Sequence, residues 1–232
     1  MRHRVVQPEL LDRLPPAYPG ALGSRADLRR LNGLMGHVGI LERALRAAGW
    51  PHAGSATGGH REPCQWVELG GGDGSLLLKL ARRFRTHGTC HTALLVDRHP
   101  FASHDAKRAF AEAGWELQTV RSDVFEWLEN PARSRADATI ANLFLHHFEE
   151  AELRRLLTAV ARQTDLFIAV EPRRSRLALA ASRLLGLIGC NAVTCYDAVV
   201  SVRAGFVGDE LSAGWPTAEW GRLAERLAEL VS

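Results

Sequence analysis

The feature that most constrains the fold of this chain is the alternation of strand-like and helix-like segments between residues 65 and 172. Short apolar runs alternate with amphipathic patterns of helical period, which is typical of βαβ units. We therefore expect an α/β fold with a doubly wound, mainly parallel sheet. The predicted strands are QWVEL (65–69), TALLV (92–96), WELQTV (115–120), ATIAN (138–142) and LFIAV (166–170), and the predicted helices span 75–85, 103–113, 125–128 and 149–162.

Each predicted strand is closed by a polar or acidic residue. These residues are Glu68, Asp97, Asp123, Asn142 and Glu171. The carboxyl ends of parallel strands meet at one edge of a sheet, and ligands of open α/β sheets bind at that edge. The sequence therefore predicts a binding site to which all five strands contribute.

The residues before the core are predicted to form a helical cap. Residues 25–48 have the pattern of a helical hairpin that bends between Gly33 and Gly39, and residues 49–63 are rich in Gly, Ser and Pro, as in a surface loop. We expect an N-terminal helical cap and linker over residues 1–64. Residues 65–232 would form the core, with C-terminal helical additions.

The residues after the core have a weaker strand signal. An apolar helix is predicted over residues 173–188, and the tail from Trp220 onward has a helical pattern. Residues 197–202 fit a strand, but a loop leading into a short helix is the better interpretation. Without a last strand, the edge of the sheet would stay open and would favour pairing with a second copy in a homodimer.

Composition argues against several classes of partner and site. The formal net charge is only +3 and the arginines are scattered, whereas nucleic-acid binding requires a concentrated basic patch. The four cysteines form no CxxC pair, so neither a metal site nor a disulfide framework is predicted. No apolar segment approaches the ~20 residues of a bilayer span, and the N-terminus does not read as a signal peptide. We expect a cytoplasmic protein that does not bind membranes.

The stretch VELGGGDGS, residues 67–75, joins the first predicted strand to the first predicted helix. Glycines there permit positive φ and let backbone N–H groups approach a ligand. A tight turn without a ligand and a dinucleotide loop are alternatives, the latter through Gly70-x-Gly72-x-x-Ser75. However, Glu68 and Asp73 would repel a pyrophosphate and attract the ammonium and sulfonium of S-adenosylmethionine. The acidic turn favours the cationic ligand.

In these motifs the chain resembles the class I (Rossmann-like) S-adenosylmethionine-dependent methyltransferases. The acidic residue and GxGxG of their first motif match Glu68, Gly70, Gly72 and Gly74. The resemblance implies that these four residues hold the methionine end of the cofactor.

The later motifs of that family follow in the same order. The resemblance assigns Asp97 to the ribose hydroxyls, and the two oxygens of a carboxylate suit two vicinal hydroxyls. It assigns Asp123 to the adenine amino group, with Val124 or Phe125 packed on the ring. It places Asn142 and Leu143 beside the cofactor.

His146 and His147 follow the fourth predicted strand. One interpretation is structural, with one histidine capping the next helix. Many small-molecule methyltransferases that resemble this chain carry LHH here, and in some of them a histidine acts as a base or orients the acceptor. A neutral imidazole suits the proton of a hydroxyl acceptor. We expect His147, or else His146, to act with Glu171, although Glu171 could instead pair with Arg173 or Arg174.

Apolar residues of the flanking helices are the candidates for an acceptor site, although core packing explains most of them. We expect a methyltransferase that acts on a small, apolar or aromatic acceptor, with a hydroxyl favoured. The alternatives are an NAD(P)-dependent oxidoreductase and a non-catalytic, cofactor-binding accessory subunit. The apolar candidates are Leu31, Leu34, Met35, Leu184, Leu187 and Ile188.

Overall fold

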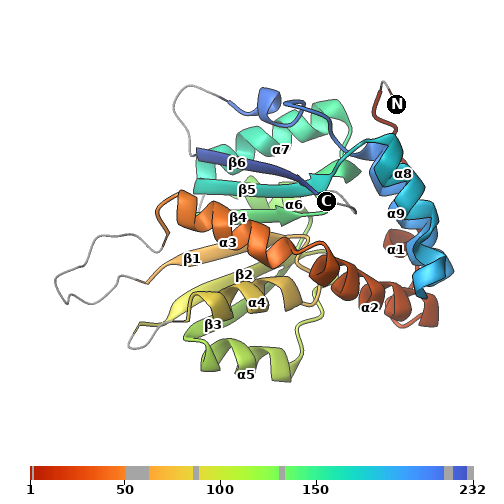
Figure 1. The fold of residues 1–232 in the computed structure, drawn as a ribbon. Helices are drawn as coiled ribbons and strands as arrows, with labels where there is room; N and C mark the ends of the chain where they lie inside the picture. The colour runs from red at the N-terminus through yellow and green to blue at the C-terminus, as the bar shows by residue number, and fades with distance from the viewer. Residues whose placement is uncertain (2, 51–62, 86–88, 131–133, 217–221, 229–232) are drawn as a thin grey trace.

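A computed structural model of the chain describes residues 1, 3–50, 63–85, 89–130, 134–216 and 222–228. It contains a six-stranded sheet of order β3-β2-β1-β4-β5-β6, in which every neighbouring pair is parallel (Figure 1). The five strands predicted from the sequence are confirmed. The strands are β1 (Gln65–Leu69), β2 (His91–Asp97), β3 (Trp115–Arg121), β4 (Ala136–Asn142), β5 (Thr164–Pro172) and β6 (Arg222–Ala228).

Helices cover both faces of this sheet, which confirms the doubly wound α/β fold. One apolar cluster joins one face to α3, α4 and α5, and a second joins the opposite face to α6 and α7. The connecting helices begin and end within a few residues of their predicted bounds. They are α4 (Ser75–Arg83), α5 (His104–Glu112), α6 (Val124–Leu128) and α7 (Glu150–Gln163).

The N-terminal helices are α1 (Leu10–Arg13), α2 (Pro19–Leu34) and α3 (His37–Ala47). The predicted hairpin breaks where expected, because Gly36 adopts the left-handed conformation with φ of 66°. However, α3 is not separate from the core. Its Leu41 and Leu45 are fully buried in the same cluster as α4. Residues 51–62 of the predicted linker lie outside the described residues.

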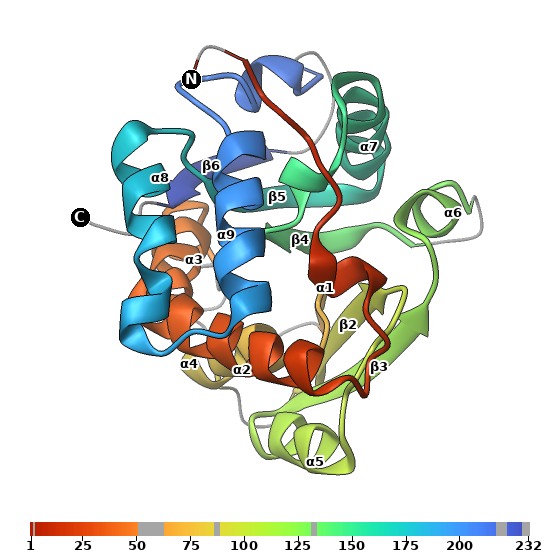
Figure 2. The ribbon, with the colours of Figure 1, turned by 90° about the vertical axis from the view of Figure 1, so that its right-hand side faces the viewer.

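Four helices lie across the carboxyl ends of the strands. Figure 2 looks toward this edge, with α1, α2, α8 (Arg176–Arg183) and α9 (Ala192–Ala204) nearest the viewer. The predicted site is therefore covered by α1 and α2 from the N-terminal part of the chain and by α8 and α9 from the C-terminal part. Within the described ranges, no helix combines the length and apolar character that crossing a bilayer requires.

Two predictions for the C-terminal part are wrong. Residues 197–202 form neither a strand nor a loop, because they lie inside α9, whose first turn is capped by the Asn191 side chain. The predicted helix over 173–188 is divided into α8 and a short 3₁₀ helix, Leu185–Ile188.

The prediction of a helical tail is also wrong. Residues Arg222–Ala228 form β6, which pairs with β5 in parallel. The spacing of Leu223 and Leu227 is helical, but the edge of β5 offers unpaired N–H and C=O groups that a strand satisfies. Tertiary pairing therefore overrides the local pattern. Because β6 covers β5, the edge of β5 at which a partner was expected is not open, and β6 is the edge strand of the described sheet.

We expect the aromatic centre of the core to dominate stability. Trp66 is fully buried and contacts Trp50 and Phe84, each with ring centroids 5.4 Å apart, and Trp115 at 4.4 Å. Trp66→Ala should lower the free energy of unfolding by about 3–5 kcal/mol through lost burial and a residual cavity. Urea denaturation measures this. The matched control Leu187→Ala, at a side chain that is 83% exposed, should change stability by less than about 0.5 kcal/mol. Equal effects of the two substitutions would contradict this view of the core.

Candidate active site at the carboxyl edge of the sheet

The glycine-rich loop between β1 and α4 has the conformation that its sequence predicts. Gly70, Gly72 and Gly74 have φ of 69°, 51° and 71°. A Cβ on Gly70 would lie 2.4 Å from the Phe144 ring, and one on Gly74 would lie 2.7 Å from Leu95. At Gly72 the requirement is conformational alone, because no atom lies within 4 Å of an added Cβ.

Asp97 ties this loop to the end of β2. Its Oδ2 accepts the Gly72 N–H at 3.0 Å, and its Oδ1 accepts the His99 N–H at 2.6 Å. The structure thus brings Asp97 and the glycine loop together, as the strand-end pattern predicts.

The two acids of the loop differ in environment. Asp73 lies 2.8 Å from the Arg29 guanidinium of α2, so its charge is compensated. Glu68 is buried, and desolvation, followed by the charges of Asp73 and Asp97, raises its pKa to about 8. In the cofactor-free protein at neutral pH, Glu68 is therefore largely protonated. Glu68 is thus not the free charge beside the loop that its sequence position suggests.

Three side chains at this edge carry buried polar atoms without a hydrogen-bond partner among the described residues. They are Glu68 (Oε2), which is buried, Asn142 (Oδ1), which is partly buried as a residue, and His37 (both ring nitrogens). His37 and Asn142 lie close enough for Asn142 to act on the His37 pKa, but without the geometry of a hydrogen bond. His37, at the start of α3, is fully buried. Desolvation lowers its pKa to about 4, although Asn142 and Glu171 oppose the shift. Buried polar atoms need a hydrogen-bond partner, and these lie at the edge where ligands of open α/β sheets bind.

Three further predicted residues lie directly after β3 and β4 at this edge. Asp123 caps α6 by accepting the Phe125 N–H at 2.8 Å, and it also accepts from Arg98 Nε at 3.1 Å. Val124, next to it, is buried. Leu143, directly after β4, has φ of 53° and is the single non-glycine residue with positive φ among those described. Backbone strain of this kind is concentrated at functional sites.

Glu171, at the end of β5, is a buried carboxylate that organises the turn after β4. Its Oε1 accepts the N–H groups of Phe144 at 2.9 Å and Leu145 at 2.8 Å, and its Oε2 accepts that of His146 at 3.3 Å. Of the two arginines that were the alternative partners of Glu171, Arg174 instead pairs with Glu210 at 2.6 Å, and Arg173 lines a neighbouring cavity.

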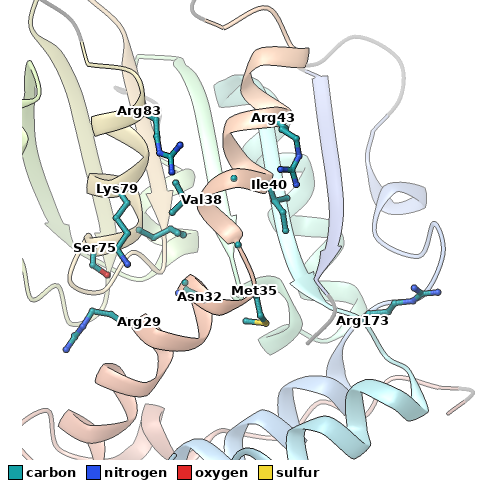
Figure 3. A pocket seen from close by; sticks show the side chains of 14 residues that line it. Arg29, Asn32, Met35, Val38, Ile40, Arg43, Ser75, Lys79, Arg83 and Arg173 are labelled. Carbon is teal, nitrogen blue, oxygen red and sulfur yellow. The ribbon is translucent and has the colours of Figure 1, made fainter. Parts of the chain in front are cut away.

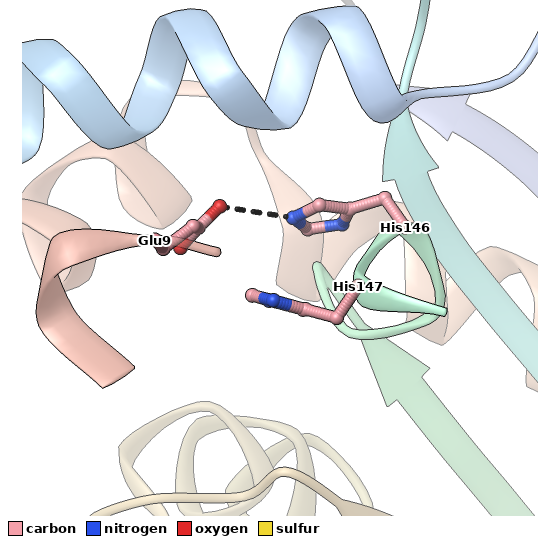
Figure 4. A group of neighbouring side chains, drawn as sticks. All are labelled: Glu9, His146 and His147. Carbon is pink, nitrogen blue, oxygen red and sulfur yellow. Dashed lines mark hydrogen bonds and ion pairs between the residues drawn. The ribbon is translucent and has the colours of Figure 1, made fainter. Parts of the chain in front are cut away.

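The two histidines of the turn have different roles (Figure 4). His146 is buried between Glu171, 2.8 Å from its Nδ1, and Glu9, 3.2 Å from its Nε2. Burial opposes ionisation, but the hydrogen bonds and charges of both carboxylates outweigh it and raise the pKa of His146 to about 9. His147 retains 24% of its side-chain exposure and lies 3.4 Å from Asp12 Oδ2 through its Nδ1. Glu171 therefore contacts His146, whereas Asp12 contacts His147.

Sequence reasoning missed the N-terminal residues of this site. Glu9 and Asp12 lie more than 130 positions from the histidines in the chain. Asp197 of α9 holds them there, since its carboxylate accepts the N–H groups of Leu10 at 2.7 Å and Leu11 at 3.0 Å. No motif in the first 20 residues signals these contacts. His37 was missed in the same way, because a lone histidine in a helix carries no signal.

A cavity of about 600 Å³ lies between the α2–α3 turn and α4 (Figure 3). Its lining includes Arg29, Arg43, Lys79, Arg83 and Arg173, and none of the described residues that line it is acidic. None of the predicted cofactor or catalytic residues lines this cavity. The cavity lies beside the glycine loop, which it reaches at Ser75.

The predicted apolar acceptor residues do not line one pocket. Met35 lines the basic cavity, and Leu31 is buried in the protein. The other four are exposed at the surface: Leu34, Leu184, Leu187 and Ile188.

Comparisons with known proteins identify a domain within the chain and its fold. Residues 67–165 match the family model described as a methyltransferase domain. The plantazolicin methyltransferase BamL, solved with a triazolic desmethylPZN analogue and SAH, is 14% identical, with 88% of this chain and 68% of that chain covered and a TM-score of 0.53.

A second plantazolicin methyltransferase, BpumL, also solved with a triazolic analogue and SAH, is 10% identical, with coverage of 85% and 69% and a TM-score of 0.56. At these identities the likeness establishes a shared fold. No curated protein matches the sequence. The family match shows a methyltransferase domain over residues 67–165, and the solved structures show that the chain shares the Rossmann-like fold of methyltransferases.

Proposed function

We propose that this protein transfers the methyl group of S-adenosylmethionine to a hydroxyl of a small, apolar or aromatic acceptor, with His147 as the base. The observation that carries the choice of base is the contrast between the histidines. His146 is locked and charged between two carboxylates, whereas His147 is partly exposed at the same turn. A general base must be accessible and able to accept a proton.

The unpaired polar atoms of the site fit the methionine end of the cofactor. Glu68 Oε2 and Asn142 Oδ1 are acceptors that an ammonium group would satisfy, and a neutral His37 has one N–H to donate to a carboxylate. We assign the glycine loop (Gly70, Gly72 and Gly74) to the same end.

We assign the nucleoside end of the cofactor to residues at the end of β2 and directly after β3. Both oxygens of Asp97 already accept backbone N–H groups, but a carboxylate has further lone pairs for ribose hydroxyls. We assign Asp123 and Val124 to the adenine, and Leu143 to the contact beside the cofactor. The Asp123 carboxylate would then accept hydrogen bonds from both Arg98 and the adenine amino group.

The proposed reaction is an in-line displacement, in which most of the rate comes from alignment. S-adenosylmethionine supplies an electrophilic methyl group on a sulfonium. His147 takes the hydroxyl proton of the acceptor at Nε2, because its Nδ1 faces Asp12. The acceptor oxygen forms its bond to the methyl carbon as the carbon–sulfur bond breaks, which leaves a methyl ether and S-adenosylhomocysteine.

The aromatic surroundings of His147 support an aromatic acceptor. The Phe144 ring lies 6.5 Å from the His147 ring and 5.2 Å from Phe148, which in turn meets Phe125 at 5.6 Å. Aromatic rings favour edge-to-face and offset partners at these separations. The plantazolicin methyltransferases, which share the fold, are solved with azole-containing substrate analogues, and this also supports a small natural-product acceptor.

We expect His147→Gln to lower kcat by about 10²–10⁴-fold, the usual contribution of a general base. Affinity for S-adenosylhomocysteine, measured by calorimetry, should stay unchanged. Turnover is measured as S-adenosylhomocysteine release with a panel of phenols. His104→Gln, at an exposed histidine of α5, is the matched control. Methylation by His147→Gln at the wild-type rate would show that His147 is not the base. A wild-type protein that binds the cofactor but methylates no acceptor would favour the accessory-subunit alternative.

We expect cofactor affinity to depend on pH through Glu68. Pairing with an ammonium group requires the ionised carboxylate, whose pKa of about 8 in the free protein means that binding must release a proton. Affinity for S-adenosylhomocysteine should therefore rise by up to about tenfold per pH unit as the pH increases toward 8. Calorimetry in two buffers of different ionisation enthalpy measures the released proton. Glu68→Gln should bind more weakly and lose this dependence, and an unchanged pH profile would argue against the pairing.

We expect stability to fall as the pH rises, because of His146. Its folded pKa of about 9 exceeds the ordinary 6.5, so its contribution is complete below about pH 6.5 and is lost as the pH rises through 9. The loss should be on the order of 3 kcal/mol. Urea denaturation across this range measures it. The raised pKa of Glu68 also lowers stability up to about pH 8, so His146→Gln should reduce the slope below pH 8 and remove it between pH 8 and 9, whereas His104→Gln should do neither. A wild-type profile without this slope would contradict the charged state.

A further inference from the structure

The turn after β4 and the N-terminal segment together present a set of metal-ligating atoms. One atom each of Glu9, His146 and His147 lies within 4.8 Å of the other two. In Figure 4 both imidazoles point toward Glu9. The three residues come from segments that are distant in the sequence, which explains why no ligand spacing is visible there.

The first ligand atom, His146 Nε2, is held in place by its other ring nitrogen. Nδ1 lies 2.8 Å from Glu171 Oε2, and Glu171 is itself fixed by three backbone N–H groups. A carboxylate that orients a histidine in this way is the usual outer partner of a metal ligand, because it fixes the tautomer and raises the basicity of the ring.

The second ligand atom already stands at a suitable distance. Zinc–nitrogen and zinc–oxygen bonds of about 2.0–2.2 Å in a tetrahedron place neighbouring ligand atoms about 3.4 Å apart. Glu9 Oε1 lies 3.2 Å from His146 Nε2. A ring nitrogen of His147 needs a shift of about 1 Å or slightly more to complete the set, and a partly exposed side chain can make this shift.

The charge of the surroundings suits a dication. Glu9 and Glu171 both contact the His146 ring, and Asp12 Oδ2 lies 3.4 Å from His147 Nδ1. Two imidazoles and a carboxylate are the donors that zinc and its neighbours in the transition series prefer, whereas Mg²⁺ and Ca²⁺ select oxygen ligands.

We propose that Glu9, His146 and His147 form a binding site for a divalent transition-metal ion of the zinc class. The fourth position is open to water or to Asp12. The ion takes the place of a proton on His146 Nε2 and fastens the N-terminal segment to the turn after β4.

Metal binding has a consequence for catalysis that rests on the proposed function. A His147 ring engaged with a metal ion cannot accept a proton from the acceptor. Bound zinc is therefore an inhibitor of methyl transfer, whereas the metal site itself does not depend on the role of His147.

The test titrates Zn²⁺ by calorimetry into the full chain after treatment with a chelator. Cys90, Cys190 and Cys195 are replaced by serine, because these three thiols are not buried and would compete for zinc. We expect one ion per chain. Glu9→Gln and His147→Gln, which preserve size and hydrogen-bonding capacity, should each weaken binding by about tenfold or more, while circular dichroism confirms that they fold. The matched control is His104→Gln with Asp105→Asn on the surface of α5, and it should leave affinity unchanged.

Absence of binding at 1 mM Zn²⁺, or binding that neither Glu9→Gln nor His147→Gln weakens, would overturn the metal site. A second readout is Co²⁺ absorption, which should report a four- or five-coordinate site in the cysteine-free background and only free aqueous ion in Glu9→Gln. Zinc that binds with these dependences but does not inhibit would support the metal site and count against His147 as the base. If His147→Gln is inactive but the wild-type protein binds no zinc, His147 is supported as the base and the metal site is contradicted.

Discussion

The buried carboxylate of Glu171 is the interaction on which the rest of the site depends. It accepts three consecutive backbone N–H groups of the turn after β4 and one ring nitrogen of His146. A carboxyl group with no exposure is tolerated here because these hydrogen bonds and the His146 ring offset its desolvation. Through this residue β5 fixes the direction of His146, the place of the Phe144 ring over the glycine loop, and the position of His147.

The same network connects the N-terminal segment and α9 to the carboxyl edge of the sheet. Arg4 donates to the carbonyl oxygens of Ala204 at 2.8 Å and Phe148 at 3.0 Å, and Asp197 of α9 accepts from the first turn of α1. Glu9 then reaches His146. The N-terminal segment is therefore part of the site and not only a cover, and any ligand of His147 must be compatible with its position.

Much of the fold could be predicted because local patterns and tertiary demands agree over residues 65–172. Leu76, Leu77 and Leu80 of α4 have helical spacing and are buried on one side, and the buried apolar run in β2 needs helices on both faces. The prediction failed for β6, where the residues favour a helix but the open edge of β5 provides the partners of a strand. It failed at α9 as well, because a helix that is apolar on several sides shows little periodicity.

For the site, the sequence by itself determined the glycine loop and the polar residues at the strand ends. Positive φ at Gly70, Gly72 and Gly74 and the parallel order of the strands follow from local chemistry and from the rules of α/β connection. Only the tertiary structure decided which carboxylate meets which histidine, that Glu68 is protonated when no ligand is bound, and that His37, Glu9 and Asp12 belong to the site. Those properties depend on burial and on contacts between distant segments, and desolvation has no signature in the order of residues along a chain.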